Sequence, residues 1–139
     1  MKAMKGVFDR SILPSLVAAA LLGLAAVIAP VWLLPLKPYP APLFPVIRTG
    51  WEGLSALTLI FLFSSGVLLG WFGRSHPFLL GVATVALLPC AALAEMLVSP
   101  TSHRLWPFEF LLYGLISLVA VLGAFVGRLA RKRFCRRAS

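Results

Sequence analysis

Four long runs of uncharged, mostly apolar residues restrict what this sequence can fold into. The runs cover residues 11–36, 53–73, 77–94 and 110–127. A helix needs about 20 apolar residues to cross a hydrocarbon core about 30 Å thick. Charged residues make up 12% of the chain and hydrophobic residues 60%, whereas soluble domains carry roughly 25% charged residues. We therefore predict an all-α membrane protein, a bundle of four transmembrane helices.

The four expected spans form one domain, residues 1–139. The two shorter runs reach the required length only if each takes in a glutamate, Glu95 in the third span and Glu109 in the fourth. Pro89 lacks the backbone N–H of a helical hydrogen bond and should bend the third span. The expected spans, and the basic tail after them, lie at about residues 11–35, 50–73, 77–98, 105–128 and 129–139.

The lysine and arginine residues predict how the bundle is oriented. If the N-terminus is cytoplasmic, the inner segments carry ten of the 13 Lys and Arg residues and the outer segments carry three. Cytoplasmic loops are enriched in these residues. The links at 73–76 and 99–104 are short, which favours antiparallel neighbours. We expect an up-down-up-down bundle with both termini in the cytoplasm (N-in/C-in), in a bacterial inner membrane.

Two segments have alternative interpretations. The first span follows basic residues, as in a signal peptide, but its apolar stretch exceeds the usual length of about 7 to 15 residues. We interpret it as an uncleaved anchor. The outer loop at 37–49 holds four prolines, which disfavour a helix and favour extended geometry. It is either an interfacial spacer, which we prefer, or a strap that docks a partner.

Small residues recur at intervals of four in every expected span. Membrane helices associate through such residues, because they let two backbones approach closely. We interpret Cys90 as one of them, since a free cysteine usually behaves as a small buried side chain. The pattern predicts that the following residues lie between helices: Ser15, Ala19, Gly23, Gly66, Gly70, Ala86, Cys90, Ala94, Gly123 and Gly127.

Three of the four acidic residues fall on the outer side of the expected bundle. Thr49 and Glu52 match a capping box at the start of the second span. Glu109 lies in the first turn of the fourth span, where the helix dipole favours an anion, whereas Glu95 lies near a helix C-terminus, where the dipole disfavours one. The candidates for an ion pair, or for an ion or substrate site, are Arg48, Glu52, Glu95, His103, Arg104 and Glu109.

Two interpretations of Glu95 stay open. Ionisable groups at membrane depth are costly and usually face the bundle interior with a partner. Glu95 could pair with Arg48, His103 or Arg104 and hold the outer ends of the helices together, which is the interpretation we prefer. It could instead bind a proton, a cation or a polar headgroup.

The sequence disfavours several other functions. His76 and His103 lie at opposite ends of the expected bundle, which disfavours haem ligation across it. Cys90 and Cys135 are far apart and form no CxxC pair, and no zinc-ligand spacing is present. The basic residues flank apolar runs, which is typical of membrane topology. We therefore expect no cofactor, no metal site and no nucleic-acid partner.

The preferred functional hypothesis is a non-enzymatic accessory or scaffolding subunit of a larger membrane complex. The alternative is a small oligomeric transporter or channel subunit with an outward-facing site of Glu95 and Glu109. A third hypothesis is a lipid-handling enzyme that uses Glu95, Glu109 and His103 as acid–base groups. The expected partners are the lipid bilayer, anionic lipid at the basic C-terminal tail, and other membrane subunits or further copies of this chain.

Overall fold

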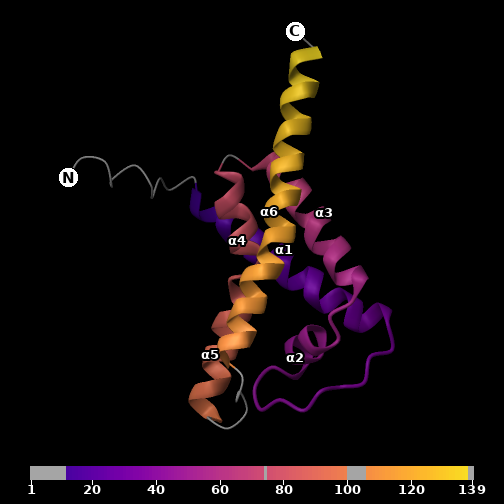
Figure 1. Cartoon of the computed structure of the whole chain (residues 1–139), viewed down its shortest axis with the longest axis vertical. Helices are drawn as coiled ribbons and strands as arrows, with labels where there is room; N and C mark the ends of the chain where they lie inside the picture. The colour runs from indigo at the N-terminus through magenta and orange to yellow at the C-terminus, as the bar shows by residue number, and fades with distance from the viewer. Residues whose placement is uncertain (1–11, 74, 100–105, 138–139) are drawn as a thin grey trace, which may run out of the picture.

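The computed structural model describes residues 12–73, 75–99 and 106–137. All regular secondary structure in these ranges is helical, and the helices gather into a bundle (Figure 1). The helices are α1 (Ile12–Leu33), α2 (Pro45–Glu52), α3 (Ala56–Phe72), α4 (Pro77–Val85), α5 (Leu87–Val98) and α6 (Trp106–Arg137).

Three stretches within the described residues are long and apolar enough to cross a membrane: α1, α4 together with α5, and α6. The pair α2 and α3 passes the same test together but is bent by 105°. It adds a fourth span only if the two helices are counted as one. The prediction of an all-α chain is therefore confirmed, with three to four helices that could cross a membrane.

The proline-rich segment ends in a helix, which corrects the prediction that it is extended throughout. α2 begins at Pro45, and proline suits a first helical turn because an N–H there has no partner. Thr49 lies inside α2, where its hydroxyl donates a hydrogen bond to the Pro45 carbonyl oxygen at 2.7 Å. The expected capping box of Thr49 and Glu52 is therefore wrong. Ser55 and Thr58 form the box that starts α3.

The third expected span is divided at Ala86, between α4 and α5. Pro89 follows three residues later and has no N–H to donate to the carbonyl oxygen of Val85. The Ala86 N–H donates to the Ala83 carbonyl oxygen at 3.2 Å, which is the tighter spacing of a 3₁₀ turn. The helix is therefore interrupted for one residue, one turn before Pro89, and the two parts together still form one stretch long enough to cross a membrane.

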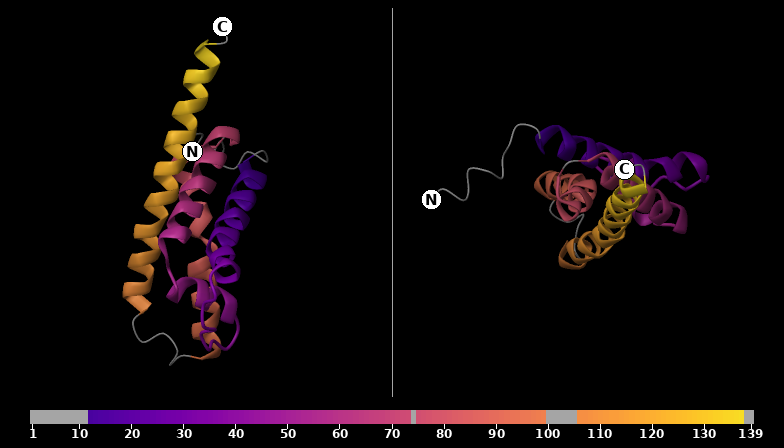
Figure 2. Two further views of the ribbon diagram at one scale, coloured as in Figure 1. Left: turned by 90° about the vertical axis from the view of Figure 1, so that its right-hand side faces the viewer. Right: turned by 90° about the horizontal axis from the view of Figure 1, so that it is seen from above.

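α6 packs most extensively against α3 and next against α4, while α1 packs against α3 and α4 (Figure 2). Glycine makes the closest of these interfaces possible. A Cβ atom added to Gly66 would collide with the Ala120 carbonyl oxygen of α6. Gly70, Gly123 and Gly127 make equally close contacts between the backbones of α3 and α6. These four glycines therefore lie between helices, as close packing in lipid requires.

The small residues of α1 also face a neighbouring helix. Ala19 and Gly23 are buried, and Ser15 is half-buried. A Cβ atom on Gly23 would collide with the Thr84 carbonyl oxygen. The contact brings the backbones of α1 and α4 together near the middle of α1.

The small residues of the third span lie on a different face from the one predicted. Ala86 and Cys90 are exposed, and Ala94 is half-buried. The buried stripe runs through the break at three- and four-residue spacing, from Gly81 and Thr84 to Leu88, Ala92 and Glu95, and leaves Ala86 and Cys90 on the opposite side. The prediction that Ala86 and Cys90 pack inside this chain is therefore wrong. The residues of α5 that are buried are Leu88, Ala92 and Glu95.

α6 is longer than a bilayer requires. It has 32 residues, which correspond to about 48 Å at a rise of about 1.5 Å per residue, against a hydrocarbon core of about 30 Å. Figure 1 shows its C-terminal part projecting beyond the other helices. The basic tail, residues 128–137, forms the C-terminal end of this helix.

Candidate functional site

Glu95 is a charged residue that is buried in the bundle. Its side chain is 4% exposed. The Oε1 atom accepts a hydrogen bond from the Phe44 backbone N–H at 3.1 Å, and the Oε2 atom lies 3.7 Å from Nη1 of Arg48. Phe44 and Arg48 belong to the segment around α2, so these contacts join that segment to α5. We call Phe44, Arg48 and Glu95 the α2–α5 clamp.

Arg48 connects the buried carboxylate to the surface of the molecule. Its Nε atom donates to Oε1 of Glu52 at 3.1 Å, since a spacing of four places both residues on one helix face. Its guanidinium carbon lies 5.6 Å from the centre of the Tyr39 ring, within cation–π range. The Glu52 side chain is 35% exposed, so water screens its pair with Arg48 more than it screens the pair with Glu95.

Further contacts hold α2 against the rest of the bundle. A Cβ atom on Gly50 would lie 2.6 Å from the Val27 carbonyl oxygen, so α2 meets the backbone of α1 there. Trp51 packs on Tyr113 of α6, with ring centroids 4.3 Å apart. α2 therefore contacts α1 and α6 as well as α5, and the clamp lies where these helices meet.

A cavity of about 20 Å³ lies beside the clamp. That volume admits about one water molecule, whereas pockets for small-molecule ligands measure about 300 Å³ or more. The walls include Trp51 and Tyr113 together with all three clamp residues. The space next to the Glu95 carboxylate is therefore suited to one bound water.

Three of the six candidate residues come together in the structure: Arg48, Glu52 and Glu95. Glu109 is half-buried in the first turn of α6. It lies one turn before the buried residue Tyr113 and so begins the buried face of that helix. His103 and Arg104, the other proposed partners of Glu95, lie outside the described residues.

The segment just before α2 contributes a group that the sequence did not reveal. Phe44 reaches Glu95 through its backbone N–H, and no side-chain pattern marks such a donor. One signal was present. If Pro45 starts a helix, Arg48 and Glu52 lie one turn apart on the same helix face. The sequence therefore could have predicted that Arg48 pairs with Glu52.

The described residues hold no group of three or more His, Cys, Asp or Glu side chains that could bind a metal ion. Comparison with protein-family models, curated proteins and solved structures finds no match to this chain.

The arrangement of the α2–α5 clamp suggests a function. A buried carboxylate that accepts a backbone N–H and faces a guanidinium can tie two helices together.

Proposed function

We propose that this protein is a non-enzymatic accessory or scaffolding subunit of a larger membrane complex. The observation that carries the proposal is the α2–α5 clamp. A transport site needs a carboxylate that its ligand can reach. The Glu95 carboxylate is instead held by Arg48 and Phe44 of its own chain, beside a cavity for about one water. This supports a structural role for the acid.

An exposed stripe on α4 and α5 supports a partner subunit. Ala86 and Cys90 are exposed one turn apart, and half-buried Ala94 continues the stripe. Leu93 and Leu97 beside it are exposed too. Small residues on a lipid-facing helix let another helix approach closely. The proposed partners are other membrane subunits or further copies of this chain, with anionic lipid along the basic tail.

The proposed topology has four spans that run up, down, up and down, with α2 and α3 together as the second. Its orientation is N-in/C-in. Figure 1 supports it, since α2, the end of α5 and the start of α6 lie at one end of the bundle and the basic end of α6 at the other. The positive-inside rule assigns that basic end to the cytoplasm. We propose the bacterial inner membrane as the location.

Purification and reconstitution together test this function. The full-length chain is purified from its native membrane in a mild detergent, and separately reconstituted alone into liposomes. We expect a stable assembly with other membrane subunits in the first experiment, and no ion or solute flux that depends on Glu95 in the second. Flux that is lost in Glu95→Gln but kept in Glu52→Gln would overturn the proposal and favour the transporter hypothesis.

A further inference from the structure

A single face of α6 runs from the lipid-exposed part of the helix into its basic tail. Large side chains on this face are exposed at intervals of three or four, and Leu122, Val126 and Leu129 are its last apolar members. The same spacing continues to Arg133 and Arg136, which are also exposed. Residues three and four apart are neighbours on a helix surface. The two arginines therefore continue the lipid-facing surface directly.

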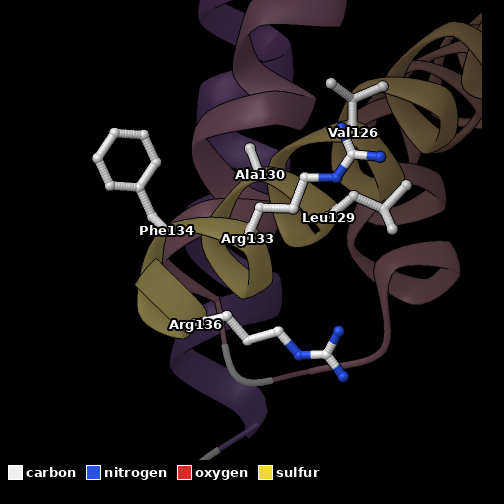
Figure 3. Close-up of a pocket in the computed structure, with 6 residues that line it drawn as sticks. All are labelled: Val126, Leu129, Ala130, Arg133, Phe134 and Arg136. Carbon is white, nitrogen blue, oxygen red and sulfur yellow. The ribbon is translucent and has the colours of Figure 1, made fainter. Parts of the chain in front are cut away.

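This face holds a groove, which we call the tail groove, next to both arginines. It is lined by Val126, Leu129, Ala130, Arg133, Phe134 and Arg136. Figure 3 shows the Arg133 guanidinium extending along α6 towards Val126, whereas Phe134 points to the opposite side of the helix. The Phe134 ring contacts Trp71 of α3, with ring centroids 5.7 Å apart. That contact ties the projecting helix to the bundle and leaves both arginines accessible.

With the end of the hydrocarbon core placed at Arg128, the Arg133 part of the groove lies at the depth of lipid headgroups, and the Arg136 backbone lies about 12 Å from Arg128 along the axis. Arg128 is the first charged residue after the apolar run at 110–127, and Arg133 follows it by about 7.5 Å along the helix axis. Headgroups occupy roughly 5 to 8 Å on each side of the hydrocarbon core. Residues 128–137 include six Lys or Arg residues and no acid. An anionic group beside residues 128–137 therefore meets a strongly basic segment.

We propose that the tail groove binds an anionic phospholipid. Arg133 and Arg136 hold the headgroup phosphate, because guanidinium groups form paired hydrogen bonds with phosphate oxygens. One acyl chain lies along Val126 and Leu129. This inference rests on the part of the proposed function that puts anionic lipid along the tail, and it assigns that lipid to one face of α6.

A charge-matched comparison tests the site. The full-length protein is titrated with phosphatidylglycerol, and with phosphatidylcholine of the same acyl chains, and bound lipid is counted by native mass spectrometry. The test variant is Arg133→Gln with Arg136→Gln. The control is Arg128→Gln with Arg131→Gln, which removes the same charge from other faces of α6. Thermal unfolding of each variant shows whether the bundle is intact.

General attraction of anionic lipid, about 1 kcal/mol per charge, should fall by the same amount in both variants, so we expect affinity for phosphatidylglycerol to fall at least about tenfold further in the test variant than in the control. Affinity for phosphatidylcholine should be the same in all proteins. Equal losses in the two variants would overturn the tail groove as a site and leave only general attraction of lipid to the tail. No preference for phosphatidylglycerol in the unsubstituted protein would overturn both the site and the proposed anionic-lipid partner.

Discussion

Glu95 and Arg48 form an ion pair between α5 and α2, with 3.7 Å between Oε2 and Nη1. α2 has eight residues, fewer than an isolated helix needs to be stable in water. Its axis is bent by 105° from that of α3, so the two do not form one straight helix. The ion pair, with the Phe44 N–H beside it, therefore helps to hold a short helix in place, together with its contacts to α1 and α6.

Removal of the buried acid should destabilise the protein far more than removal of the exposed one. Glu95→Ala leaves Arg48 without its buried partner, and loss of one member of a buried pair costs about 3 kcal/mol. Glu52→Ala removes the partly exposed partner of the same arginine and should cost less than about 1 kcal/mol. Unfolding in detergent, followed by circular dichroism, measures both. Equal losses would argue against the clamp.

The glycines between α3 and α6 should tolerate no added methyl group. Gly66→Ala places a Cβ against the Ala120 carbonyl oxygen, and such overpacking costs about 1 to 3 kcal/mol. Gly114 is the matched control, because a Cβ there meets nothing within 4 Å. Gly114→Ala should leave stability unchanged or raise it by up to about 1 kcal/mol, since alanine is the better helix former. The same unfolding measurement checks both, and a stable Gly66→Ala variant would contradict the packing.

The two cysteines report the proposed orientation. Both are exposed, but Cys90 lies within a proposed span and Cys135 in the basic tail. A charged maleimide reacts with thiolate in water, so it should label Cys135 in inside-out vesicles and leave right-side-out vesicles unlabelled. Cys135→Ser should abolish the signal. Labelling of Cys135 in right-side-out vesicles would contradict a cytoplasmic C-terminus.

The helical segments could be predicted from the sequence where long apolar runs indicate contact with lipid. The long apolar runs lack charge and must satisfy their backbone groups internally, so α1 and α6 were predictable. The break at Ala86 was also indicated, since Pro89 removes one donor. α2 was missed because the four prolines at 37–49 favour an extended chain. Pro45 lies at the first position of α2, where proline is tolerated because an N–H there has no intrahelical partner.

The candidate site could be predicted only in part, because tertiary contacts decide it. Glu95 was identified by its depth and by the unfavourable helix dipole, and Arg48 was among its expected partners. The backbone donor of Phe44 lies 51 residues away in the chain, and only the docking of α2 brings it near. Cys90 is exposed because the buried face of α4 and α5 is the one that carries Leu88, Ala92 and Glu95, and the spacing of small residues alone did not show which face packs inward.

A double-mutant cycle on Arg48 and Glu95 tests the clamp most directly. The free energy of unfolding in detergent is measured for Arg48→Met, Glu95→Gln, the double variant and the unsubstituted protein. Each single substitution removes the Arg48–Glu95 pair but leaves the other charge in place, whereas the double variant removes both charges. We predict a coupling energy of at least about 1.5 kcal/mol and a double variant more stable than Arg48→Met. Effects that add to within about 0.5 kcal/mol would contradict the account, because they would show that the two residues act independently.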